Sequence, residues 1–194
     1  MRLRRRYGGA APVTATPLVL TVPGWTGSGP GHWQSLWERA HPRRFRRVEQ
    51  ADWENPRLGD WIRTLDDAIA HASRPVVLVA HSLGCITVAH WAAVHARPVA
   101  GALLVAPADV ERADTPAPIR PFAPVPLRPL PFRSLLVAST DDEFVTMERA
   151  EHFARCWGSE LVPIGAAGHV HTAAGFGPWP RGERLLDEVC AGER

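Results

Sequence analysis

The stretch that decides the fold is PVVLVAHSLGCITVAHWAAVHA, residues 75–96. Its first part, residues 75–80, is rich in Val and Leu without polar alternation, which predicts a strand buried on both faces of a parallel sheet. Its second part, residues 83–96, is long, rich in Ala and apolar on most sides, and predicts a helix buried against that sheet. Ser82 therefore lies at the turn between the strand and the helix.

The residues around Ser82 are small, as a sharp reversal of the chain requires: Ala80, Gly84 and Cys85. Parallel sheets present ligand-binding groups at the carboxyl ends of their strands. The pattern resembles the G-x-S-x-G nucleophile elbow, in which a strained backbone lifts a serine hydroxyl clear of the sheet. Here Ala80 stands in place of the first glycine. The alternative is that Ser82 only caps the helix, so the rest of the chain has to decide.

Predicted strands and helices alternate along the rest of the chain. Further strands are predicted over residues 17–22, 45–50, 98–106, 134–138 and 160–164. Further helices are predicted over residues 32–40, 55–69, 143–157 and 181–191. Such alternation implies right-handed crossovers and a parallel sheet between two layers of helices. We therefore expect an α/β protein, a three-layer α/β/α sandwich with a mainly parallel sheet of about six strands, in one domain over residues 17–194.

Two segments fall outside this alternation. Residues 1–16 combine a basic run, MRLRRRY, with small residues, and we expect a flexible tail there. Residues 107–133 hold eight of the chain's 19 prolines, separated by apolar residues such as Ile119 and Phe122. Long connections inside compact domains are often functional, so we expect residues 107–133 to form a Pro-rich pocket wall or short lid.

Charge and cysteine content limit the classes of function. All 22 basic residues are arginine, which excludes a lysine nucleophile, a Schiff base and a P-loop lysine. The net charge is only +2, and no nucleic-acid-reading motif accompanies the arginine clusters, so we expect no nucleic-acid partner. The three cysteines lack metal or redox spacing. With no apparent signal or membrane-spanning segment, we expect a cytoplasmic protein without membrane association, metal or cofactor.

If Ser82 is a nucleophile, it needs a base, an acid that orients the base, and donors for an oxyanion. In this architecture the acid and then the histidine follow the serine along the chain. Asp141 and Asp142 come just after a predicted strand; we favour Asp142 as the acid and keep Asp141 as the alternative. His169 follows the last predicted strand, and we favour it over His171 because the preceding glycine leaves room for the ring to turn.

The segment VPGWTGSGPGHW, residues 22–33, follows the first predicted strand and is expected to supply one backbone oxyanion donor. We favour the N–H of Trp25 over that of Thr26. The second expected donor is the N–H of Leu83, directly after the candidate nucleophile. The glycine spacing in this segment does not match the dinucleotide-binding fingerprint G-x-G-x-x-G.

These residues predict acyl transfer to water. We favour small esters as substrates, because an alkoxide leaves more readily than an amine. An amidase, a peptidase or an acyltransferase could use the same groups, and a non-catalytic interaction module on a hydrolase shell is a further alternative. Either a monomer or a dimer is compatible with the sequence. Candidates for lining a small apolar pocket, which could equally be core residues, are Trp25, Thr26, Phe122, Phe144 and Trp179.

Motifs spread from about residue 17 to residue 186 point the same way. They are VPGW, HW..LWE, HSLGC, ASTDD, WGSEL, GAAGHV and GFGPWP. In this combination the chain resembles the small bacterial serine hydrolases related to retinoblastoma-binding protein 9, a compact branch of the α/β-hydrolase superfamily. The resemblance implies that fold, with Ser82 as nucleophile, Asp142 as acid and His169 as base. The family usually has proline after the acid and glycine before the histidine of the elbow, where this chain has Glu143 and Ala80.

Overall fold

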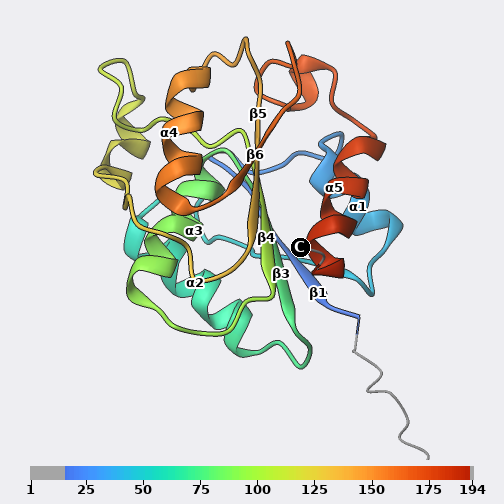
Figure 1. The fold of residues 1–194 in the computed structure, drawn as a ribbon. Helices are drawn as coiled ribbons and strands as arrows, with labels where there is room; N and C mark the ends of the chain where they lie inside the picture. The colour runs from blue at the N-terminus through green and yellow to red at the C-terminus, as the bar shows by residue number, and fades with distance from the viewer. Residues whose placement is uncertain (1–15, 193–194) are drawn as a thin grey trace, which may run out of the picture.

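The computed structural model describes residues 16–192. Its centre is a six-stranded sheet in which all five neighbouring pairs are parallel, in the order β2-β1-β3-β4-β5-β6 (Figure 1). The strands are β1 (Leu18–Val22), β2 (Phe45–Arg47), β3 (Val76–His81), β4 (Gly101–Val105), β5 (Ser134–Ala138) and β6 (Glu160–Pro163). The α-helices are α1 (Trp33–Ala40), α2 (Leu58–Ala70), α3 (Leu83–Val94), α4 (Met147–Trp157) and α5 (Pro180–Ala191).

Helices cover both faces of this sheet, so the expected three-layer sandwich is confirmed. Helices α1 and α5 lie on one face, and α2, α3 and α4 lie on the other (Figure 1). Alternate residues of β3 enter the two cores: Val77 and Val79 face α1 and α5, whereas Leu78 and Ala80 face α2 and α3. Because β3 is covered on both sides, all its residues are buried, as its unbroken apolar run predicts.

Several predicted boundaries shift for local reasons. The helix predicted from residue 143 begins at Met147, because the Thr146 hydroxyl caps it by accepting from the Arg149 N–H at 3.2 Å. The strand predicted over residues 45–50 ends at Arg47, at the edge of the sheet. The expected tail over residues 1–16 lies outside the described residues, apart from Thr16.

The Pro-rich segment packs against the layer of α2, α3 and α4. It contains a short 3₁₀ helix, η1 (Ala117–Phe122), which contacts α3. The His90 ring of α3 donates from Nε2 to the Phe122 carbonyl at 2.8 Å, and the Trp157 indole of α4 donates to the Pro126 carbonyl at 2.9 Å. These bonds fix the segment beside the carboxyl ends of the strands, which lie at the top of Figure 1.

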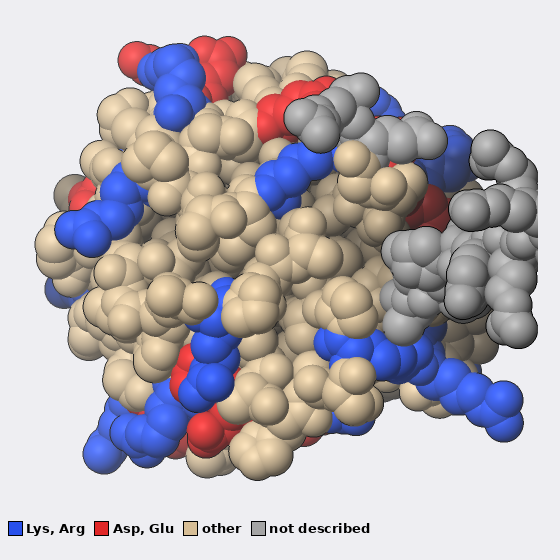
Figure 2. Space-filling model, turned by 60° about the horizontal axis from the view of Figure 1, so that its bottom comes forward, with Lys and Arg blue, Asp and Glu red and all other residues tan. Residues whose placement is uncertain are grey.

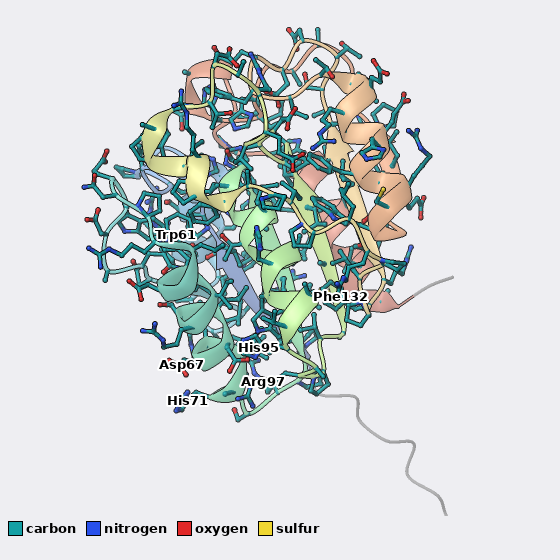
Figure 3. The ribbon with its side chains drawn as sticks, turned by 90° about the vertical axis from the view of Figure 1, so that its left-hand side faces the viewer. Trp61, Asp67, His71, His95, Arg97 and Phe132 are labelled. Atoms are coloured by element: carbon teal, nitrogen blue, oxygen red, sulfur yellow. The ribbon has the colours of Figure 1, made fainter. Side chains whose placement is uncertain are left out.

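A partly exposed charge cluster around Asp66 ties α2 to the carboxyl end of α3. Asp66 of α2 accepts from the Trp91 indole at 3.1 Å and from two nitrogens of the Arg97 guanidinium at 2.8 and 3.0 Å. His95 lies 3.2 Å from the same carboxylate. Figure 3 shows His95 and Arg97 at the lower ends of the two helices, opposite the carboxyl ends of the strands. The cluster therefore holds α3 at the end remote from Ser82.

The face at the amino ends of the strands carries scattered arginine side chains, with acidic and many uncharged residues between them (Figure 2). Over residues 16–192, no helix has the length and apolar character that crossing a bilayer would need.

Candidate active site

Ser82 sits in a strained turn between β3 and α3. Its φ of +55° and ψ of −122° lie in a region that residues other than glycine rarely adopt. The Ser82 N–H donates to the Val105 carbonyl of β4 at 3.0 Å, which fixes the turn to the neighbouring strand. The Ser82 side chain makes no capping hydrogen bond to α3, so the hydroxyl does not act as a helix cap.

Two glycines allow the first loop of the sheet to lie against this turn. A β-carbon on Gly84 would come 2.1 Å from the Val22 carbonyl oxygen, and one on Gly24 would come 2.8 Å from the Ser82 β-carbon. Both separations are too short for real atoms, so both positions require glycine. The close approach places the segment after β1 directly beside the amino end of α3.

The structure brings Ser82, His169 and Asp142 into one hydrogen-bonded chain. The Ser82 Oγ lies 2.8 Å from His169 Nε2, and His169 Nδ1 lies 2.9 Å from each oxygen of the Asp142 carboxylate. The three residues follow β3, β6 and β5, three parallel strands whose carboxyl ends share one edge. The His169 ring and the Asp142 carboxylate are almost fully buried. A carboxylate that accepts from Nδ1–H and a hydroxyl that donates to Nε2 form the arrangement that a general base beside a nucleophile requires.

Asp141, the alternative acid, binds the backbone of the histidine loop instead of the ring. Its Oδ1 accepts from the N–H groups of Ala167 and Gly168 at 2.8 and 2.7 Å, and from the Ser139 hydroxyl at 2.7 Å. The hydrogen bond from Ser139, followed by those from the loop backbone, lowers the pKa of Asp141 below its ordinary value. His171, the alternative base, has a separate role, because its Nδ1 accepts from the Ala174 N–H at 3.3 Å.

The two candidates for the first oxyanion donor differ in what their N–H groups already bind. The Thr26 N–H donates to the Trp53 carbonyl at 3.0 Å and is therefore engaged. This leaves the Trp25 N–H as the candidate from this loop. Leu83, the second candidate, is the first residue of α3, where backbone N–H groups have no partner within the helix.

Buried polar contacts hold the loop that carries Trp25. The Ser28 hydroxyl donates to Gln34 Oε1 at 2.6 Å, and the Gln34 amide donates to the Val79 carbonyl of β3 at 3.0 Å. The Arg47 guanidinium donates to the Ser28 carbonyl at 3.1 Å. These supports could not be predicted, because their partners come from β2, β3 and α1 and meet only in the fold.

A cavity of about 250 Å³ opens beside the Ser82 hydroxyl. Its apolar wall includes Phe144 together with Ile119 and Pro116. The last two belong to the Pro-rich segment, which therefore contributes to the pocket. The polar wall consists mainly of His81, Ser82, His169 and His171. Trp25 and Thr26 also line it, as the sequence predicts. Ala108 belongs, like Ile119 and Pro116, to the segment expected as a pocket wall. The sequence did not indicate His81, Leu83 or His171 as lining residues.

Phe122 and Trp179, candidates for either the pocket or the core, belong to the core. Phe122, the last residue of η1, is fully buried, with its ring centroid 5.6 Å from that of Trp61. Trp179 lies on the other side of the sheet, where it stacks on Trp37 at 6.1 Å. The apolar sequence around each of these aromatic residues predicts that it is buried, but it does not predict which face of the sheet the residue covers.

Two further histidines are buried next to the candidate base: His81 contacts the His169 ring, and His32 contacts the His81 ring. Desolvation by burial lowers the pKa of His32 to about 3, and burial likewise holds the pKa of His81 well below its ordinary value. Both rings are therefore neutral near pH 7. Among residues 16–192, no group of three or more His, Cys, Asp or Glu side chains is arranged to hold a metal ion.

A family model described as serine hydrolase matches residues 19–188. The chain belongs to the serine hydrolase family. The resemblance to the hydrolases related to retinoblastoma-binding protein 9 is thereby confirmed, since they are members of the same family. A comparison with curated proteins found no match.

This serine hydrolase is similar to several solved structures. A YdeN-like hydrolase from Pectobacterium atrosepticum shares 34% identity, with a TM-score of 0.81 and 91% of each chain covered. The ydeN gene product of B. subtilis shares 20% identity, with a TM-score of 0.73, over 91% of this chain and 100% of that one. The butyrate-bound esterase Est2 from Thermogutta terrifontis shares 16% identity, with a TM-score of 0.66, over 96% of this chain and 87% of that one. The B. subtilis and T. terrifontis structures, at 20% and 16% identity, show the shared fold alone.

Proposed function

We propose that this serine hydrolase cleaves small carboxylic esters, with Ser82 as nucleophile, His169 as general base and Asp142 as the acid that orients the base. The observation that carries the proposal is the unbroken chain of hydrogen bonds from Ser82 Oγ through the His169 ring to Asp142, at 2.8 and 2.9 Å. A serine hydroxyl is almost fully protonated at neutral pH, so it needs an adjacent base to attack a carbonyl.

The first half of the reaction forms an acyl-enzyme. His169 Nε2 takes the proton from Ser82 Oγ as the oxygen attacks the ester carbonyl carbon. The carbonyl oxygen becomes an oxyanion, which accepts from the N–H groups of Trp25 and Leu83. Asp142 accepts from the Nδ1–H of His169, which fixes the tautomer and stabilises the imidazolium. The oxyanion then collapses, the bond between the carbonyl carbon and the alkoxide oxygen breaks, and His169 gives its proton to that oxygen, so that an alcohol leaves and the acyl group stays on Ser82.

The second half returns the enzyme to its starting state. A water molecule gives a proton to His169 Nε2 and attacks the acyl carbon, and the bond to Ser82 Oγ breaks as the oxyanion collapses. Ser82 recovers its proton from His169, and a carboxylic acid is released. The cavity of about 250 Å³, with an apolar wall formed by Ile119 and Phe144, favours a short apolar acyl group.

A fluorophosphonate probe and p-nitrophenyl esters test this function. We expect wild type to be labelled and to hydrolyse p-nitrophenyl butyrate. Ser82→Ala should lose both, with kcat lower by at least about 10³-fold. Ser73→Ala is the matched control, because Ser73 lies on the exposed turn after α2. Labelling that persists in Ser82→Ala, or no labelling of folded wild type, would overturn the proposal. Faster turnover of the matching p-nitroanilide would overturn only the preference for esters.

A further inference from the structure

The loop that carries His169 has a strained backbone. Val170, directly after the candidate base, has a φ of +51° and is fully buried. A positive φ is unfavourable for any residue with a β-carbon and most of all for a β-branched one. Such a conformation is energetically costly and persists only where surrounding contacts impose it. The contacts that hold this turn therefore also set the position of the His169 ring.

Two buried ring N–H groups hold consecutive carbonyls of the strained turn. His81 Nε2 donates to the His169 carbonyl at 2.8 Å, and the Trp33 indole donates to the Val170 carbonyl at 2.9 Å. Both donor side chains are buried, so water does not compete freely for these bonds. Together with the Asp141 carboxylate, which holds the N–H groups of Ala167 and Gly168, they hold the turn on both sides of the base.

His81 stands out among these contacts because of its place in the chain. It is the last residue of β3 and directly precedes Ser82, so one short piece of backbone carries both the nucleophile and the donor to the base. The His81 ring is packed between those of His32 and His169, with centroids 4.9 Å from each. His32 is fixed in turn, because its Nδ1 accepts from the Gln34 N–H at 3.2 Å.

We propose that His81 is a positioning residue: its Nε2–H bond to the His169 carbonyl holds the base at hydrogen-bonding distance from Ser82, and Trp33 secures the next residue. This inference rests on the proposed function, because it assigns a role relative to the same nucleophile and base. The bond ties the strand that carries the nucleophile to the loop that carries the base, and so fixes their separation.

A matched pair of variants tests whether the bond itself matters. The amide nitrogen of His81→Gln reaches the place of the imidazole Nε2 and can donate to the His169 carbonyl. His81→Asn is equally polar but too short to reach it. His90→Leu is the control, because it removes an equal bond, 2.8 Å to the Phe122 carbonyl, that does not touch the histidine loop. The measurements are kcat and KM for p-nitrophenyl butyrate, the fluorophosphonate labelling rate and the melting temperature.

Misplacing a catalytic group by about 1 Å can lower a rate by about 10²-fold. We therefore expect kcat and the labelling rate of His81→Asn to fall by about 10–100-fold, with KM within about twofold of wild type. His81→Gln should keep kcat within about threefold, and so should His90→Leu. If the role of His81 were purely structural, the variants would have lower melting temperatures. The loss in His81→Asn would then not be confined to kcat, and His81→Gln would not restore kcat.

Three results would overturn the positioning role: wild-type kcat in His81→Asn, equal losses in the Asn and Gln variants, or an effect confined to KM. If His81→Asn does not fold, the glutamine variant decides, and a loss of more than about tenfold in its kcat counts against the role. Failure of the proposed function looks different, because wild type itself would then show no Ser82-dependent labelling, which would overturn both proposals.

Discussion

Asp141 and Asp142 are neighbours in the chain but hold different parts of the same loop. The Asp142 carboxylate accepts from the His169 ring, whereas Asp141 accepts from the backbone N–H groups of Ala167 and Gly168. One aspartate therefore faces the imidazole and the other shapes the turn that presents it. The two contributions, one to the chemistry of the base and one to the fold of its loop, can therefore be tested separately by substituting each aspartate.

Asparagine substitutions at the two positions should differ by orders of magnitude in activity. Asp142→Asn removes the charge that stabilises the imidazolium and disturbs the tautomer, so we expect kcat to fall by about 10³–10⁴-fold. Asp141→Asn keeps a carbonyl oxygen for the loop N–H groups, and its kcat should stay within about tenfold of wild type. Steady-state kinetics with p-nitrophenyl butyrate measures both. The reverse order would assign the acid to Asp141.

Phe144 should limit the length of the acyl chain. It lines both the cavity at Ser82 and an adjoining cavity of about 210 Å³, and its ring lies 4.5 Å from that of His169. Phe144→Ala should join the two spaces. The ratio of kcat/KM for the octanoate ester to that for the butyrate ester should rise by at least about tenfold, since each buried methylene contributes about 0.8 kcal/mol. Leu127→Ala, another exposed apolar position away from the cavity, should leave the ratio unchanged.

Gly84 should not tolerate even a methyl group. In Gly84→Ala the new β-carbon would lie 2.1 Å from the Val22 carbonyl oxygen, so the turn at Ser82 must move or the protein must unfold. We expect a lower melting temperature and loss of Ser82 labelling. Gly59→Ala is the control, because nothing lies within 4 Å of its β-carbon in α2, and it should gain up to about 1 kcal/mol of stability. Equal behaviour of the two variants would contradict the close approach.

Asp66 should affect stability and leave the reaction unchanged. Asp66→Asn weakens the bonds to Arg97 and Trp91, and we expect the free energy of unfolding to fall by about 1–3 kcal/mol. The hydrogen bond from Arg97 lowers the pKa of Asp66 from its ordinary 3.8. A lowered pKa in the folded state means that this stabilisation is complete above pH 3.8 and is lost as the pH falls through the folded-state value.

Urea unfolding of wild type and Asp66→Asn between pH 2 and pH 7 checks this dependence. The stability difference between the two proteins should shrink as the pH falls below the ordinary pKa of Asp66. The kcat of the variant near pH 7 should match that of wild type, because the cluster lies at the opposite end of α3 from Ser82. A constant difference at all pH values would contradict the assigned pKa direction.

The parts of the fold that follow from local sequence could be predicted. The apolar run over residues 75–80 specifies a doubly buried strand, and the small residues after it specify a sharp turn. Because carboxyl ends of parallel strands share one edge, the chain order indicated that Ser82 would meet an aspartate at position 141 or 142 and a histidine at position 169 or 171. The structure places Ser82 and Asp142 each within hydrogen-bonding distance of the His169 ring.

The supports of the site could not be predicted, because they depend on contacts between distant parts of the chain. Trp33 and Val170 are 137 residues apart, and a tryptophan on a helix face indicates burial but not which carbonyl its indole will bind. The same ambiguity left Phe122 and Trp179 open between pocket and core, since an aromatic residue suits both. The separate roles of Asp141 and Asp142 depend on the turn of the backbone between them.

The hydrogen bond from the Ser82 N–H to the Val105 carbonyl ties Ser82 to the middle of the sheet, where β3 and β4 have neighbours on both sides. On warming, fraying should begin at the margins, in the three-residue β2 and the partly exposed β6, and leave the centre in register. Thermal inactivation would then be an all-or-none event that coincides with global melting, and half-denatured samples would contain two populations, one fully active and one inert.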